Sequence, residues 1–126
     1  MPITIEFIRP NRVVLQTYRD PIDAAQFAEL KRRMHTEILP AAAGKVHIIA
    51  DFRQVKNLPG TMLSRGAQML ETAHPNTGTI VFLTDNMFMS RMAQIFARLA
   101  PRFQVAVVSS LDEAQRIIDK ALTPHL

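Results

Sequence analysis

Few side chains in this sequence have the types and spacing that catalysis or metal binding requires. The chain has no cysteine, which excludes a thiol nucleophile, a disulfide and a zinc–thiolate site. No two of its four histidines have the i, i+4 spacing of a helical zinc site. They are His35, His47, His74 and His125. We interpret them as surface or strand-edge residues, and we expect no metal site and no cofactor.

Other polar candidates follow apolar runs that are typical of strands. They are Asp51, the pair Thr84 and Asp85, and the pair Ser109 and Ser110. Asp51 and Thr84 resemble the acceptor and threonine of phospho-acceptor receiver domains, but residues 8–11 supply no acidic pair for magnesium. Ser109 also stands where receivers carry a lysine. We therefore interpret Asp51 as a polar strand end that accepts hydrogen bonds from nearby backbone N–H groups.

Catalysis of another kind would need an acid and a base at a useful spacing, and the sequence shows no such pair. The G-x-S-x-G, Walker and Rossmann glycine patterns are also missing. We expect the chain not to be an enzyme. That expectation would change if the fold brought Asp51, Asp85 and a histidine together in a deep pocket.

The elements that must position these residues follow from the spacing of the apolar side chains. Alternation or continuous apolar runs predict strands, and a period near 3.6 predicts helices. The predicted strands are 3–7, 12–18, 46–52, 79–84 and 103–108. The predicted helices are 20–39, 60–73, 86–100 and 110–121. The order is β-β-α-β-α-β-α-β-α in one domain, residues 1–126.

This order predicts an α/β fold with a mixed four- or five-stranded sheet and helices packed on its faces. The first two strands form an antiparallel hairpin, and the later crossovers are right-handed and parallel. The first helix is expected to be capped by Asp20, with Pro21 in its first turn. Ser110 and Glu113 form a capping box for the last helix, whose inward residues would include Ala121.

The third predicted helix combines an apolar stripe with several methionines. The stripe expected to be buried is Phe88, Met92, Ile95, Phe96 and Leu99, while Arg91, Gln94 and Arg98 face water. Met89 lies off that stripe. Methionine side chains adapt to varied surfaces, so Met87, Met89 and Met92 are candidates for apolar contact with a protein partner, a second protomer or an apolar ligand.

The net charge is +4, from 15 Lys and Arg against 11 Asp and Glu. The basic residues are scattered and are not interleaved with aromatics, so we expect no nucleic-acid binding. No apolar run approaches the roughly 18–20 residues of a membrane helix. The first ten residues, MPITIEFIRP, do not have the pattern of a secretory signal, and we expect a cytoplasmic protein.

The order of the elements resembles that of the STAS family, which includes anti-sigma factor antagonists and sulfate transporter tails. In that family the third strand ends in Asp, and a short turn leads to D-S-S-G at the start of the second helix. Residues 51–58 match this lead-in, and Pro59-Gly60-Thr61-Met62 occupies the D-S-S-G position. Residues 109–114 also match the family's ending. The likeness covers essentially the whole chain.

The resemblance implies a non-catalytic regulatory or protein-interaction module, of the anti-sigma factor antagonist type or of the SEC14-related branch. Thr61 stands where the family carries its phosphorylatable serine, so a degenerate phospho-switch is implied there. The implied partner-binding residues are Asn57, Gly60, Thr61, Arg65 and Gln68. A hydroxyl at that position can also simply cap the helix. The alternative function is a small-molecule or lipid-binding carrier of the same fold.

Overall fold

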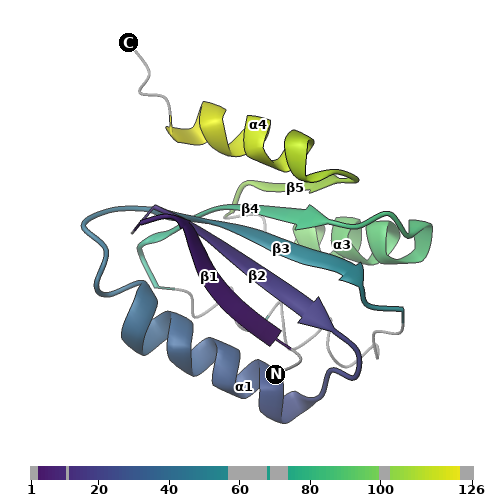
Figure 1. The fold of residues 1–126 in the computed structure, drawn as a ribbon, viewed down its shortest axis with the longest axis horizontal. Helices are drawn as coiled ribbons and strands as arrows, with labels where there is room; N and C mark the ends of the chain where they lie inside the picture. Colours follow the sequence, from purple (N-terminus) through teal and green to yellow (C-terminus); the bar gives the residue numbers. More distant parts are fainter. Residues whose placement is uncertain (1–2, 11, 57–67, 69–73, 100–102, 123–126) are drawn as a thin grey trace.

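The computed structural model describes residues 3–10, 12–56, 68, 74–99 and 103–122 (Figure 1). The strands are β1 (Ile3–Arg9), β2 (Val13–Arg19), β3 (Val46–Gln54), β4 (Thr77–Leu83) and β5 (Val105–Val108). The helices are α1 (Ala24–Arg33), the π-helical turn η1 (Met34–Ile38), α3 (Met87–Leu99) and α4 (Leu111–Leu122). The helix predicted at 60–73 lies outside the described residues except for Gln68, which is helical.

The five strands form one sheet in the order β1-β2-β3-β4-β5. β1 pairs with β2 antiparallel, and every later pair is parallel. This arrangement confirms the predicted mixed sheet and gives it five strands. The first seven residues of β3 are buried, as its continuous apolar run predicts for an interior parallel strand.

The helices cover the two faces of the sheet unequally. Figure 1 shows α1 and α3 on one face and α4 on the other. α1 connects β2 to β3, and α3 connects β4 to β5, so both connections run in the same direction across the sheet. Because such crossovers are right-handed, α1 and α3 must lie on the same face. α4 follows the last strand and packs on the opposite face, where Ala114 and Ile118 join a second buried cluster. Ala121 is exposed, so the prediction that it points inward is wrong.

A row of aromatic side chains crosses the larger core. Tyr18 of β2 stacks on Phe52 of β3, with ring centroids 4.2 Å apart and an angle of 12° between the planes. Phe82 of β4 lies 5.8 Å from Phe52, and Phe96 of α3 meets Phe82 edge-on at 5.0 Å. These residues come from four elements, so the row aligns β2, β3 and β4 and docks α3 on them.

The start of α1 differs from the prediction. Asp23, not Asp20, is the cap: its carboxylate accepts the Gln26 N–H at 2.9 Å, and the Gln26 side chain accepts the Asp23 N–H at 3.0 Å. Asp20 instead accepts the Lys56 N–H at 2.8 Å, which ties the start of α1 to the chain after β3. Asp20 and Pro21 are joined by a cis peptide bond. The buried residues predicted for this helix, Phe27, Leu30, Met34 and Ile38, are all buried.

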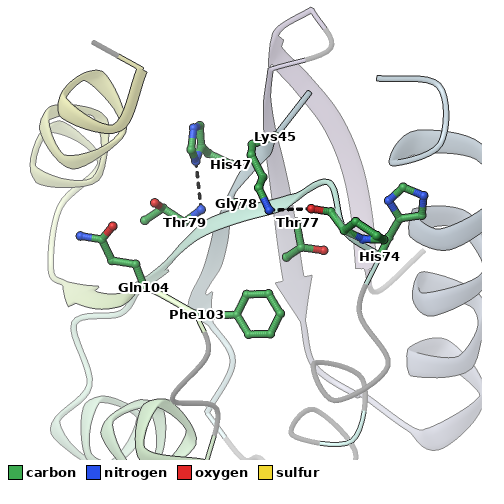
Figure 2. Close-up of a pocket in the computed structure, with 9 residues that line it drawn as sticks. Lys45, His47, His74, Thr77, Gly78, Thr79, Phe103 and Gln104 are labelled. Atoms are coloured by element: carbon green, nitrogen blue, oxygen red, sulfur yellow. Dashed lines mark hydrogen bonds between the residues drawn. The ribbon is translucent and has the colours of Figure 1, made fainter. Parts of the chain in front are cut away.

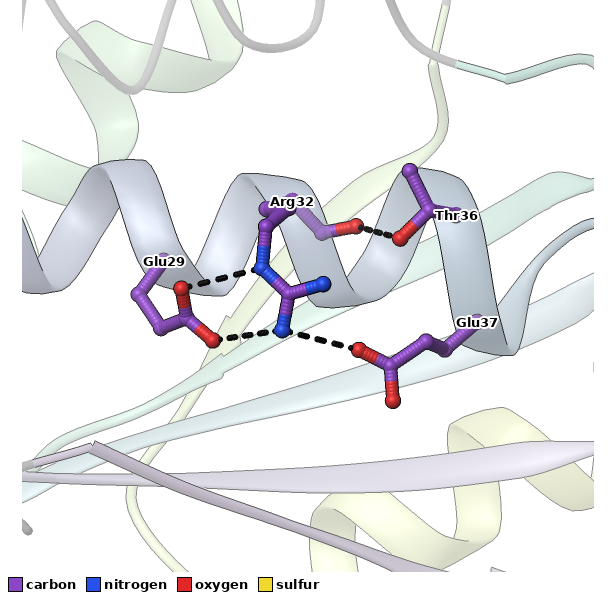
Figure 3. Close-up of polar contacts among 4 residues, drawn as sticks. All are labelled: Glu29, Arg32, Thr36 and Glu37. Carbon is purple, nitrogen blue, oxygen red and sulfur yellow. Dashed lines mark hydrogen bonds and ion pairs between the residues drawn. The ribbon is translucent and has the colours of Figure 1, made fainter.

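The end of this helix widens into η1, where the Leu39 N–H reaches the Met34 carbonyl at 2.9 Å. On its exposed side, Figure 3 shows Arg32 bound to Glu29 through two hydrogen bonds, 3.0 and 2.7 Å, and paired with Glu37 at 3.0 Å. These contacts hold the pKa of Glu29 below its usual value, chiefly through the hydrogen bond from Arg32. Exposed ion pairs of this kind add little stability, so the network mainly orients these side chains.

Candidate functional site

The carboxyl ends of the parallel strands form one edge of the sheet, the place where α/β proteins most often bind ligands and partners. Asp51 is buried there and binds Arg53 in three ways. Its carboxylate accepts the Arg53 backbone N–H at 3.0 Å and the guanidinium Nε and Nη2 at 3.1 and 2.9 Å. The side-chain hydrogen bonds that Arg53 donates to Asp51 raise the pKa of Arg53, and the negative charge of Asp85 adds to the effect. Asp51 thus accepts a nearby backbone N–H as predicted, but it is not the end of the strand, because β3 continues to Gln54.

The chain leaves β3 at this edge through a short turn. The Val55 N–H bonds to the Phe52 carbonyl at 3.0 Å, and the next residue is held by Asp20. Four of the partner-binding residues implied by the STAS resemblance lie outside the described residues: Asn57, Gly60, Thr61 and Arg65. Gln68 is helical and exposed.

The next element at the same edge is α3. The Thr84 N–H bonds to the Val108 carbonyl at 3.0 Å, and the Thr84 hydroxyl accepts the Asn86 N–H at 3.2 Å. Asn86 then caps α3, because its side-chain oxygen accepts the N–H groups of Phe88 and Met89 at 2.8 and 3.3 Å. This agrees with the helix predicted to begin at residue 86.

The buried side of α3 is rotated relative to the prediction. Met89, Ala93 and Phe96 face the core, with 3%, 7% and 8% of their surface exposed. Phe88 and Ile95 were expected inside, yet they are 55% and 43% exposed. Together with Met92, these two residues form a second triplet with the same i, i+4, i+7 spacing as the buried one. Periodicity alone therefore cannot decide which triplet is buried. The choice comes from the sheet, where Phe96 packs on Phe82.

This rotation leaves an apolar surface on α3, which we call the α3 face: Met87, Phe88, Met92 and Ile95. Met87 is 73% exposed, and Met92 is half-buried. Arg91 and Arg98 are exposed on the same helix, as predicted. Met89 is a core residue, so the expectation that it lies off the buried stripe is wrong.

His47 does not lie beside Asp51 at the carboxyl edge. His47 is four residues before Asp51 on β3, which at ~3.3 Å per residue separates them by about 13 Å. Among the described residues no group of three or more His, Cys, Asp or Glu could hold a metal ion. In the same part of the chain, no helix is long and apolar enough to cross a membrane.

A second polar region lies at the opposite, amino edge of the sheet. There a cleft is lined in part by His47 and His74, together with Lys45, Thr79 and Gln104 (Figure 2). His47 is 8% exposed and is the second residue of β3, so of the two expected placements it is not a surface residue but lies near a strand end. Sequence reasoning missed the cleft because its residues come from three segments that only the parallel strands bring together.

The fold just described is that of a STAS-like α/β protein. No protein-family model matches the sequence, and no curated protein matches it. A particular protein with this arrangement is TM1081, whose NMR structure matches with a TM-score of 0.68 and 15% sequence identity. The match covers 94% of this chain and 88% of that chain. At this identity the likeness shows the fold alone.

Proposed function

We propose that this chain is a non-catalytic regulatory module that binds a protein partner through the α3 face and the adjoining carboxyl edge of the sheet. The observation that carries the proposal is the exposure of Met87, Phe88 and Ile95 on one helix. Large apolar side chains grouped on a surface are typical of binding sites, whereas single ones are ordinary.

The composition of this surface suits a protein interface. Phenylalanine, methionine and arginine are enriched in the cores of interfaces, and binding energy concentrates in a few such anchors. Phe88 is the largest exposed anchor, and Arg91 and Arg98 can meet acidic groups on the rim of a partner. The side-chain oxygen of Asn86 fixes the first turn of α3 by accepting the N–H groups of Phe88 and Met89, so the anchor is held on an ordered element.

The first test replaces Phe88 with serine. Because an aromatic anchor contributes about 2 kcal/mol or more, Phe88→Ser should weaken partner binding by roughly 30-fold. The partner would be captured with the wild-type chain, purified, and titrated by calorimetry against each variant. Sedimentation of the isolated chain would separate binding of another protein from pairing of two copies.

The matched control is Phe7→Ser. Phe7 is also a phenylalanine with 42% of its surface exposed, but it lies on the edge strand β1. The substitution Phe7→Ser should leave the affinity for the partner unchanged. Equal losses from both substitutions, or none from Phe88→Ser, would contradict the assignment of the α3 face.

The second part of the proposal concerns Thr61, the hydroxyl that the STAS resemblance places at the start of the second helix. A phosphate there would add about two negative charges to the docking surface and repel an acidic partner. Thr61→Glu should therefore weaken partner binding several-fold, while Thr61→Val, which keeps the side-chain volume, should not. Retained binding by both Thr61→Glu and Arg65→Ala would reject the switch while leaving the α3 face untouched.

The alternative, a carrier of a small apolar or lipid ligand, predicts a different measurement. Native mass spectrometry of the purified chain would show a copurifying ligand if the chain were a carrier, and the bare mass of the chain if it were not. The interaction module is preferred because Met87, Phe88 and Ile95 are exposed on α3, where a partner protein can cover them.

A further inference from the structure

We propose that the cleft at the amino edge of the sheet binds the phosphate group of a small molecule. The cleft has a volume of about 350 Å³. It lies beside the first residues of β3 and β4 and the residues that precede β5. It is on the opposite edge from the α3 docking surface, so this site is separate from the proposed partner-binding function. Its polar lining includes Lys45, His47, His74, Thr79 and Gln104 (Figure 2).

Backbone contacts decide which ring nitrogens of the two histidines carry protons. The Thr79 N–H donates to Nδ1 of His47 at 3.0 Å, and the Asn76 N–H donates to Nδ1 of His74 at 3.0 Å. A neutral imidazole that accepts at Nδ1 carries its proton on Nε2. Both rings are therefore hydrogen-bond donors at Nε2, whether neutral or charged.

Lys45 supplies positive charge. Its ammonium donates to the Pro75 carbonyl at 2.6 Å, which fixes the side chain and uses one of three N–H groups. None of the described residues that line the cleft is Asp or Glu. Arg12 adds to the positive potential, since after burial it is the next cause that lowers the pKa of His47. A region rich in hydrogen-bond donors and positive charge suits a phosphate group, because all its oxygens are acceptors once it is fully deprotonated.

The cleft is also held in place by its surroundings. A side chain at Gly78 would collide with His47, because a Cβ built there lies 2.6 Å from Nδ1. The Asn76 amide donates to the carbonyls of Leu39 and Ala42 at 2.9 and 3.1 Å, which ties the turn before β4 to the end of η1. Lys45, His47 and His74 are thus held by backbone contacts before any ligand arrives, which reduces the entropic cost of binding.

The test is a titration of the ¹⁵N-labelled chain, followed by NMR at constant ionic strength, with inorganic phosphate in one series and phenyl phosphate in the other. Inorganic phosphate and phenyl phosphate share the phosphate group that the cleft is proposed to bind. Tighter binding of phenyl phosphate would identify an organic phosphate as the natural ligand. We expect saturable shifts of the amides of Thr77, Gly78, Thr79 and Gln104. Lys45→Ala should weaken binding by about tenfold, as for a lost charged hydrogen bond.

The control is Lys120→Ala, which removes an exposed lysine from α4 and the same net charge. It should leave the affinity unchanged. Absence of saturable shifts with both phosphates would overturn the proposal. An equal loss from Lys120→Ala and Lys45→Ala would overturn it too, because the attraction would then be diffuse. Lys45 is exposed, so its substitution leaves the core intact and the spectrum itself verifies the fold.

Discussion

Replacing Ile49 with alanine is expected to lower the free energy of unfolding by about 2–5 kcal/mol, the range for large-to-small changes in a core. Ile49 is fully buried at the middle of β3. It pairs with Leu15 of β2 and Val81 of β4, and on its face of the sheet it belongs to the cluster that receives α4. Removing its side chain would leave a cavity between the sheet and α4, which the paired strands cannot close.

The matched control is Ile95→Ala, the same substitution at a residue that is 43% exposed on the α3 face. It should change the free energy of unfolding by about 0.5 kcal/mol or less, as is usual for surface positions. Urea denaturation followed by circular dichroism would measure both variants. Similar losses at the two positions would show that the burial assigned to Ile49 and Ile95 is wrong.

The second large effect is expected at a buried polar pair, Tyr18 and Gln16. The Tyr18 hydroxyl donates to the side-chain oxygen of Gln16 at 2.6 Å, and the residues are 4% and 5% exposed. Burial raises the pKa of Tyr18, so the hydroxyl keeps its proton and remains a donor. Tyr18→Phe would keep the ring stacked on Phe52 but leave the Gln16 oxygen without this donor. We expect a loss of about 1–3 kcal/mol.

A double-mutant cycle separates this cost from a general disturbance of the core. Gln16→Leu alone removes the acceptor and should also destabilise the chain. The double variant, Tyr18→Phe with Gln16→Leu, removes both polar groups and should lose less than the two single losses added together. Urea denaturation of the four chains gives the coupling. Simple additivity would show that the hydrogen bond contributes nothing beyond packing.

Much of the fold could be predicted because it depends on local patterns. The alternation at 3–7 predicts a half-buried strand and the continuous apolar run at 46–52 predicts an interior strand, and β1 and β3 are observed there. Ser110 also caps the last helix as predicted, its hydroxyl accepting the Glu113 N–H at 3.2 Å. Such features need only neighbours in the sequence, so they are readable before folding.

The candidate sites were harder to predict, and the reasons differ. On α3, two apolar triplets share one period, and only contact with Phe82 shows which triplet is buried. At the start of α1, Asp20 and Asp23 are both acceptable caps by type, and the capping box with Gln26 selects Asp23. The cleft residues Lys45, Thr79 and Gln104 lie far apart in the sequence and carry no motif.

The sequence by itself determined the order of strands and helices, the parallel character of the interior strands and the role of Asp51 as an acceptor for a nearby backbone N–H, because these follow from periodicity and residue type. Tertiary structure alone decided which side of α3 is exposed and that His47 is buried. Those outcomes depend on side chains brought together by the sheet, and no local pattern records such contacts. The α3 face and the amino-edge cleft are therefore products of packing.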